Sequence, residues 1–241
     1  MIRRRDLLTV PLALLAVPAR AFVRWHEAAL PSAAPIIESL YRHPFITGLI
    51  DGTLPRESFL WYHAQNYHYL AGFEASLSAL ARRLPDEKDR RRLLRWASDT
   101  ASLMPWTRDL LQTWGKRHRP EGFLALRPTT RRYIDWEQTN ANRAPLSVAW
   151  ATLLPCFWVY GEVGRFVEQQ RYEASPYAAW LAGYADPAYD ATVEEAVALA
   201  DRLSDAEIGL RSTMTAAFLR SVNYEVRLWD AAVQLEKASG D

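Results

Sequence analysis

The stretch that decides the fold runs from Pro55 to Asp86 and reads PRESFLWYHAQNYHYLAGFEASLSALARRLPD. Its large apolar residues recur every three or four positions, which is typical of one buried stripe along an α-helix. These residues are Phe59, Tyr62, Tyr69, Phe73, Leu77, Leu80 and Leu84. Pro55 opens the segment, where a missing N–H does no harm, and Pro85-Asp86 ends it. We therefore predict a long helix with one face in the protein core.

The same helical spacing continues on both sides of this segment, and the alternation typical of β-strands is nowhere convincing. Further helices are expected over residues 35–51, 87–117, 128–140, 145–171, 174–184, 190–203 and 205–237. No repeat, low-complexity tract or linker interrupts residues 22–241, and a chain of 241 residues can bury one large core. The sequence thus predicts an all-α, multi-helix bundle that forms a single domain over residues 22–241.

Composition argues against several classes of function. The 29 Lys and Arg residues are balanced by 28 Asp and Glu residues, so nothing suggests a surface for nucleic acid. A single cysteine excludes an internal disulfide and a zinc site built from cysteines. The five histidines are scattered, and none stands at metal-ligand spacing with a carboxylate. We predict no metal and no cofactor.

The first 21 residues, MIRRRDLLTVPLALLAVPARA, have the features of an export signal. Three arginines precede an apolar run over residues 7–17, and residues 19–21 fit a small-x-small cleavage site. The run is shorter than the ~20 residues that span a bilayer. Residues 4–8, RRDLL, resemble a twin-arginine signal. We predict export to the periplasm without stable membrane insertion after cleavage; the alternative is a short amphipathic first helix on a cytoplasmic protein.

Three expected helices each carry one polar or reactive residue in an otherwise apolar stripe. In the last helix this residue is Glu225, and the stripe around it consists of Met214, Phe218, Ser221, Trp229 and Ala232. A buried carboxylate without a partner is costly, and its pKa usually rises until the group is neutral. Glu225 is therefore a candidate proton donor. The alternatives are an internal ion pair with an arginine, or a helix face assigned one position off.

The other two residues are Cys156 and Asn66. Cys156 follows Pro155, and a proline within a helical run frees a carbonyl one turn back and kinks the helix beside the thiol. Cys156 could also be a small core hydrophobe, and Asn66 a hydrogen-bonding core residue. Four tyrosines could form flat pocket walls with a hydroxyl at one end, or ordinary core: Tyr69, Tyr133, Tyr160 and Tyr184.

Four blocks of the chain resemble the TenA family, thiaminase II. They are HPFITGLIDGTLPRESFLWYHAQNYHYL (43–70), LLPCFWVYGEVG (153–164), WLAGY (180–184) and NYEVRLWDAA (223–232). They occur in the family's order and spacing and are distributed over nearly the whole length of residues 22–241. The resemblance implies a haem-oxygenase-like helical bundle, which agrees with the all-α prediction, and a homotetramer that acts on a small-molecule aminopyrimidine or on thiamin.

The resemblance also implies a reaction. In this family a cysteine adds to the pyrimidine ring, a glutamate protonates a ring nitrogen, and water replaces the leaving group at the methylene carbon, giving hydroxymethylpyrimidine. By motif, Cys156 matches the nucleophile and Glu225 matches the acid. The family's pocket tyrosines match Tyr69, Tyr133, Tyr160 and Tyr184. Because the thiolate is the reactive form, we expect a neighbour that lowers the pKa of Cys156 from about 8.5.

One position departs from the family's pattern. Where the family has an aspartate that binds the pyrimidine's amino group and assists proton movement around the cysteine, this chain has Asn66. An amide accepts a hydrogen bond from an amine but cannot carry a proton. We predict an exported hydrolase for thiamin or its aminopyrimidine breakdown products; the alternative is a non-catalytic binder of an aminopyrimidine or similar flat heterocycle. A ring oxidase resembling the pyrroloquinoline quinone synthase ranks third, because the inward positions are aromatic rather than basic.

Overall fold

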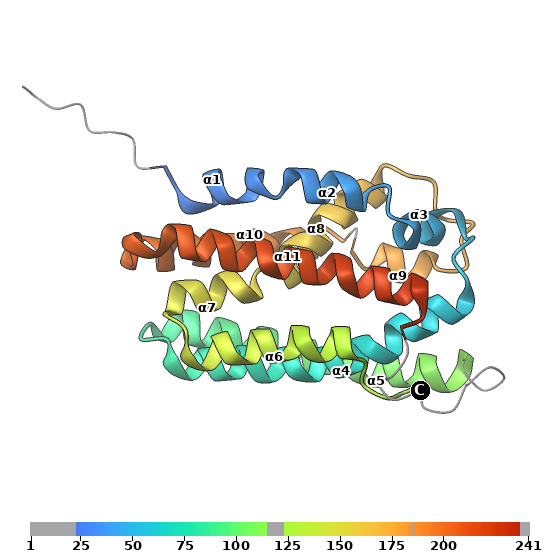
Figure 1. The fold of residues 1–241 in the computed structure, drawn as a ribbon, viewed down its shortest axis with the longest axis horizontal. Helices are drawn as coiled ribbons and strands as arrows, with labels where there is room; N and C mark the ends of the chain where they lie inside the picture. Colours follow the sequence, from blue (N-terminus) through green and yellow to red (C-terminus); the bar gives the residue numbers. More distant parts are fainter. Residues whose placement is uncertain (1–22, 115–122, 185, 237–241) are drawn as a thin grey trace, which may run out of the picture.

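The computed structural model describes residues 23–114, 123–184 and 186–236 (Figure 1). Within these residues all regular structure is helical, which confirms the all-α prediction. The helices are α1 (Trp25–Ser32), α2 (Ala34–Leu40), α3 (Pro44–Asp51), α4 (Arg56–Arg83), α5 (Glu87–Trp114), α6 (Pro128–Arg143), α7 (Leu146–Leu153), α8 (Pro155–Glu168), α9 (Ala178–Ala182), α10 (Pro187–Ala206), the 3₁₀ turn η2 (Ile208–Leu210) and α11 (Arg211–Gln234). The predicted export signal lies outside the described residues.

The helices form two layers whose long members run along the same direction (Figure 1). In one layer α4 packs against both α5 and α6. In the other, α11 and α10 lie beside α8 and are flanked by α1. The short helix α7 contacts α6 and α11 and so joins the layers, while α9 packs against α3 and α8. The polar residues of interest stand on helices from both layers.

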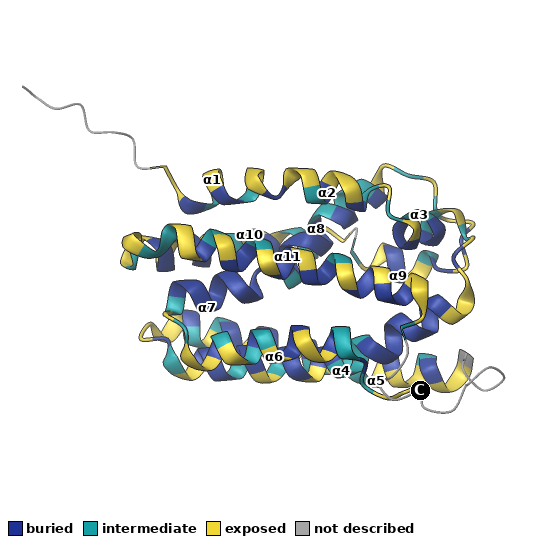
Figure 2. Cartoon of the chain, in the orientation of Figure 1, coloured by how far each residue is buried: buried dark blue, intermediate teal, exposed yellow. Residues whose placement is uncertain are grey.

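Buried positions face the space between the layers (Figure 2). One hydrophobic cluster extends from Trp25 in α1 to Ala232 in α11. The stripe predicted for the last helix is confirmed, because all its members are buried: Met214, Phe218, Ser221, Glu225, Trp229 and Ala232. Burial of apolar area on this scale is the main stabilising contribution to the bundle.

Two of the expected helices are each divided in two. The stretch 35–51 forms α2 and α3, because the chain turns at Tyr41 and Pro44 restarts the helix. The His43 ring caps α3 by accepting the N–H of Phe45. The stretch 145–171 forms α7 and α8, and the break lies at Leu154, where Pro155 provides no N–H to continue the ladder. The kink expected beside Cys156 is therefore present.

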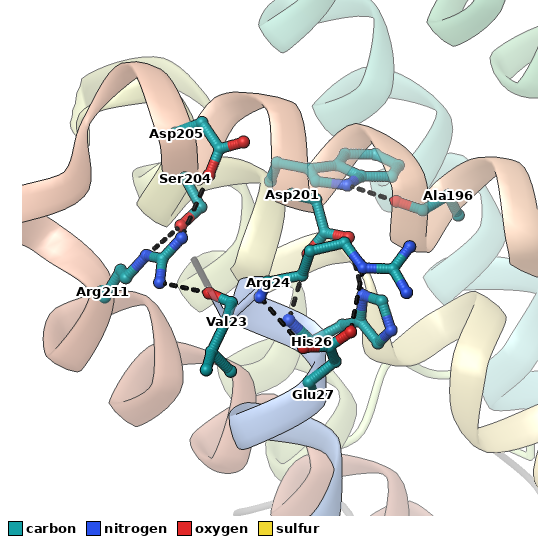
Figure 3. Close-up of polar contacts among 10 residues, drawn as sticks. Val23, Arg24, His26, Glu27, Ala196, Asp201, Ser204, Asp205 and Arg211 are labelled. Atoms are coloured by element: carbon teal, nitrogen blue, oxygen red, sulfur yellow. Dashed lines mark hydrogen bonds and ion pairs between the residues drawn. The ribbon is translucent and has the colours of Figure 1, made fainter. Parts of the chain in front are cut away.

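Helix α1, which the sequence patterns did not predict, is fastened to α10 and α11 by polar contacts (Figure 3). Asp201 Oδ1 accepts a hydrogen bond from the backbone N–H of His26 at 3.1 Å, and Asp201 Oδ2 lies 2.6 Å from the Nδ1 of the His26 ring. Arg211 donates to the carbonyl of Val23 at 2.7 Å and to Ser204 at 2.9 Å. These contacts hold the described start of the chain against the second layer.

Among the described helices, one stretch, Leu146–Glu168, is long and apolar enough to cross a membrane. Most of it, 83%, is buried inside the fold. A core helix of a globular protein has the same length and composition, so this stretch is weak support for a membrane span.

Candidate active site

A cavity of about 420 Å³ lies between α4, α5, α8 and the segment around α9. Its walls are largely aromatic, and five of the seven predicted site residues line it: Asn66, Tyr69, Cys156, Tyr160 and Tyr184. Leu103 and Trp106 of α5 also line the cavity and are about half exposed, at 51% and 49%. The cavity therefore opens to solvent beside α5.

The other two predicted residues, Tyr133 and Glu225, are buried behind this wall. The Tyr133 ring stacks on that of Tyr69 with centroids 5.0 Å apart, and its hydroxyl donates to Glu225 Oε1 at 2.8 Å. Tyr69 itself lines the cavity. The structure thus brings all seven predicted residues into one region, with Tyr133 and Tyr69 between Glu225 and the open space.

Glu225 is fully buried, and its Oε2 has no hydrogen-bond partner among the described residues. Burial raises its pKa from 4.5 to about 7, against the hydrogen bonds from Tyr133 and Tyr160, which lower it. The side chain makes no ion pair with any described arginine, so the interpretation as an internal salt bridge is wrong. A carboxyl group poised near neutral pH can both give and take a proton.

Cys156 is the second residue of α8, directly after the kink at Pro155. Burial raises the pKa of its thiol well above the usual range, and the charges of Glu225 and Glu137 raise it further. Only its side-chain interaction with Tyr69 lowers it. The expectation of a neighbour that lowers the thiol pKa is therefore wrong overall, because burial dominates and the charge of Glu137 was not foreseen. The resting side chain is a neutral thiol.

The tyrosine walls are held by stacking and by hydrogen bonds. Tyr160 stacks on Tyr184 with centroids 5.0 Å apart, and Trp180 meets Tyr184 edge-on at 4.9 Å. The hydroxyls of Tyr62 and Tyr160 share a hydrogen bond of 2.7 Å. Offset aromatic pairs of this kind form rigid flat surfaces that suit a planar heterocycle.

Glu137 on α6 is a residue that the sequence interpretation missed. It is fully buried, and its Oε1 accepts a hydrogen bond from the Tyr69 hydroxyl at 3.0 Å. Its pKa is raised well above the usual value by burial and by the charge of Glu225. A signal was present, because Thr130, Tyr133 and Glu137 follow one helical stripe that ends at Ala141. That stripe carries a carboxylate just as the last helix does.

The fit of α8 against the chain after α9 depends on Gly164. A Cβ at this position would lie 2.0 Å from the carbonyl oxygen of Tyr184, far inside contact distance. We expect Gly164→Ala to push Tyr184 out of the cavity wall and to lower the free energy of unfolding by roughly 1–3 kcal/mol. Gly209→Ala is the matched control, since its Cβ would meet nothing within 4 Å. Urea unfolding of both variants measures this effect. Equal losses of unfolding free energy in the two variants would contradict this account.

His63 lines the cavity from α4 and is fully buried, yet neither ring nitrogen has a hydrogen-bond partner among the described residues. Burial lowers its pKa from 6.5 to about 3, so the ring is neutral. It stands edge-on to the rings of Phe59, Trp106 and Trp180. A polar ring in such a place adds nothing to stability by hydrogen bonding.

We therefore expect His63→Leu to leave the free energy of unfolding unchanged or to raise it. The matched control is Gln65→Leu on the same helix, which is equally buried. The Gln65 amide donates to the carbonyl of Ala125 at 2.9 Å and accepts the N–H of Arg127 at 2.8 Å. Its loss should cost about 1–3 kcal/mol. Thermal and urea unfolding measure both, and a larger loss at position 63 would show that His63 is structurally required.

Among the described side chains, no group of three or more His, Cys, Asp or Glu residues is placed to hold a metal ion. The cavity and the wall behind it hold one thiol, two buried carboxyl groups and several tyrosine hydroxyls. Such a set supports nucleophilic addition and proton transfer to a bound ring.

Known structures share this architecture. A TenA family transcription regulator from Silicibacter sp. TM1040 superposes with a TM-score of 0.78 at 22% identity, covering 87% of this chain and 96% of that one. A domain with a heme oxygenase-like fold from Shewanella denitrificans OS217 gives a TM-score of 0.61 at 14% identity, covering 86% and 92%. The predicted haem-oxygenase-like fold is confirmed.

Sequence relatives include the aminopyrimidine aminohydrolase of Bacillus subtilis, 26% identical over 216 residues that cover 89% of this chain and 92% of the relative. The thiamine biosynthesis multifunctional protein ThiED of Corynebacterium efficiens is 34% identical over 155 residues, 64% of this chain. The match spans only 21% of that longer protein. A sequence model of the TENA/THI-4/PQQC family matches residues 30–235, so the chain belongs to this family.

Proposed function

We propose that the protein is a hydrolase of the thiaminase II type that releases hydroxymethylpyrimidine from aminopyrimidine breakdown products of thiamin, or from thiamin itself. The observation that carries this proposal is the placement of Cys156 in an aromatic cavity backed by Glu225, a buried carboxyl group with a pKa of about 7. The relatives named aminopyrimidine aminohydrolase support the choice of substrate class.

Binding follows from the shape and polarity of the walls. The stacked pair Tyr160 and Tyr184 provides a flat face for the pyrimidine ring. The Asn66 amide oxygen can accept a hydrogen bond from the ring's amino group. The leaving group would then point toward the opening beside Trp106, through which it departs.

The chemical steps balance without an external oxidant or reductant. The Cys156 sulfur, as thiolate, forms a bond to a ring carbon while Glu225 gives its proton to a ring nitrogen. The ring's electron pair then expels the leaving group from the methylene carbon: an amine takes up one proton as it departs, whereas the thiazole of thiamin leaves as a neutral ring. Water adds to that carbon and gives up one proton, which in the first case replaces the one taken by the amine. The C–S bond then breaks, and the proton on the ring nitrogen returns to Glu225. For an aminomethylpyrimidine the sum is an aminomethyl group plus water giving a hydroxymethyl group plus ammonia.

The test is an assay of the purified full-length protein with aminomethyl- and formylaminomethyl-pyrimidine and with thiamin. Hydroxymethylpyrimidine is measured by liquid chromatography and mass spectrometry, and we expect it from at least one aminopyrimidine. Absence of product from all three substrates at high enzyme concentration would contradict the proposal.

The rival function, a binder without turnover, rests on Asn66 in the cavity wall. The Asn66→Asp variant distinguishes this function from that of a hydrolase. A gain of turnover in this variant would support an enzyme that the amide slows. Tight binding of hydroxymethylpyrimidine with no turnover in either form would support the binder.

We also propose that the protein is exported, on the strength of the arginines, apolar run and cleavage triplet in residues 1–21. Replacement of both Arg4 and Arg5 by lysine should retain the precursor in the cytoplasm. Cell fractionation with immunoblotting measures this, and unchanged distribution of the variant would contradict a twin-arginine route.

A further inference from the structure

The second buried carboxyl group, Glu137, has no role in the mechanism above. Its Oε1 accepts from the Tyr69 hydroxyl at 3.0 Å, and its Oε2 has no hydrogen-bond partner among the described residues. No described lysine or arginine forms an ion pair with it. Burying a carboxyl group in this way lowers the stability of the fold. A purely structural role therefore does not explain why a glutamate occupies position 137.

The groups that face Glu137 come from four helices, and none of them is a cation. They are Tyr69 on α4, Tyr133 on its own helix α6, Cys156 on α8 and Glu225 on α11. Two carboxyl groups in one uncharged, buried region repel each other when both are ionised. The pair therefore binds its first proton tightly and titrates as a unit rather than as two independent acids.

The proposed reaction leaves the thiol proton without an acceptor. Burial and both carboxyl groups keep Cys156 protonated at rest, and the Asn66 amide cannot take up a proton. Tyr69 is the residue that connects the Cys156 thiol with Glu137. It lines the same cavity as Cys156, it lowers the pKa of the thiol, and its hydroxyl donates to Glu137 Oε1 at 3.0 Å.

We infer that Glu137 takes up the proton of the Cys156 thiol through the Tyr69 hydroxyl, as a positioning residue that never touches the substrate. The thiol proton passes to the Tyr69 oxygen as the proton of Tyr69 passes to Glu137 Oε1. The negative charge moves from the carboxylate to the sulfur, and no proton is lost to solvent. This inference rests on the proposed function for its purpose in catalysis.

Glu225 and Glu137 then have separate tasks. In the reactive form of the pair its one proton is on Glu225, which delivers it to the ring nitrogen, while Glu137 is ionised and receives the proton from the thiol. After addition of sulfur to the ring, the pair again holds one proton and one negative charge. When the C–S bond breaks, both transfers reverse. Charge is thus conserved in a region that has no described cation to neutralise a second negative charge.

The test is the pH dependence of alkylation of Cys156 by iodoacetamide, without substrate, in the full-length protein. Because the chain has one cysteine, the mass of the intact protein reports on this thiol alone. In the wild type, the rate should rise as Glu137 ionises and then level off, since the proton only moves within the relay. In Glu137→Gln the thiol must lose its proton to solvent, so the rate should rise tenfold per pH unit over the same range.

Two further variants test the same proton relay. Tyr69→Phe should abolish the plateau as Glu137→Gln does, because it removes the hydroxyl that joins the two groups. Asn66→Asp added to Glu137→Gln should restore a plateau, because it places a proton acceptor in the cavity wall. Glu57→Gln, at an exposed position of α4, is the matched control and should leave the profile unchanged. In the hydrolase assay, Glu137→Gln should lower kcat about 100-fold.

An unchanged alkylation profile in folded Glu137→Gln and Tyr69→Phe would overturn the inference, whatever the hydrolase assay shows. Loss of the plateau without rescue by Asn66→Asp would also overturn it, since the change would then reflect disturbed packing. If the plateau in the alkylation rate depends on Glu137 but the protein turns over no aminopyrimidine, the proposed function is contradicted while the relay stands. Circular dichroism of each variant confirms that the comparison is between folded proteins.

Discussion

Cys156→Ala is expected to lower kcat for hydroxymethylpyrimidine release by roughly 10⁴-fold or more, because removal of a covalent nucleophile leaves only binding and proton transfer. The side chain is small, so the loss should not come from unfolding. The tyrosine walls remain in the variant, and added hydroxymethylpyrimidine should still raise its Tm. Steady-state kinetics and thermal shift on the same preparations measure the two effects.

Cys156→Ser is the matched control for the size and polarity of the thiol. A serine hydroxyl in the same buried surroundings is a far weaker nucleophile, so this variant should be nearly as inactive as Cys156→Ala. If Cys156→Ala retained a tenth or more of the wild-type kcat, the reaction would have to proceed by direct attack of water, and the covalent mechanism would be abandoned. If it lost ligand binding as well, Cys156 would be a packing residue.

Helical periodicity predicted which side chains point inward, and this was enough to find most of the site. Glu225, Cys156 and Asn66 were visible as exceptions within apolar stripes, and the structure places all three in or behind the cavity wall. Helices α4, α8 and α11 each present such an exception to one interior. Because the bundle has a single core, inward-facing exceptions on different helices have few places to go.

The segment over α6 shows where the same reasoning stopped short. Its buried stripe is short and contains only two large apolar residues, Tyr133 and Ile134, so Glu137 gives a weaker signal than Glu225 does. The contact with Tyr69 joins residues 68 positions apart and depends on how α6 packs on α4. Periodicity within one helix carries no information about that packing.

The direction of the pKa shift of Cys156 could not be predicted from the sequence for a related reason. The expectation of a lowered pKa came from the reactivity required of a nucleophile, whereas the structure shows burial and two carboxyl groups that raise it. The sign of a pKa shift depends on distances to charges on other helices. Sequence spacing gives no such distances across a bundle.

Glu225→Gln is expected to lower kcat by about 10²–10⁴-fold, because the amide can hydrogen-bond to a ring nitrogen but cannot protonate it. The substitution keeps the size of the side chain, and Tyr133 can still donate to the amide oxygen. Binding of hydroxymethylpyrimidine should therefore change much less than kcat. A variant with near wild-type kcat would show that Glu225 does not supply the proton.

The same substitution should change how stability depends on pH. The folded-state pKa of Glu225, about 7, lies above its ordinary value of 4.5, so the folded protein holds a proton that the unfolded chain releases. The stabilisation is complete below pH 4.5 and is lost as the pH rises to about 7, a loss of about 3 kcal/mol from this group. In Glu225→Gln that loss is absent. Ionisation of Glu137 also becomes easier once its charged neighbour is gone, which flattens the profile further.

Urea unfolding at pH 5 and pH 8 measures the difference. The wild type should lose more free energy of unfolding between these two values than Glu225→Gln, and the double variant with Glu137→Gln should lose least. Equal losses in the wild type and both variants would mean that Glu225 is ionised in the folded protein throughout this range. In that case it could not protonate the ring, and the division of tasks between the two buried carboxyl groups would fail with it.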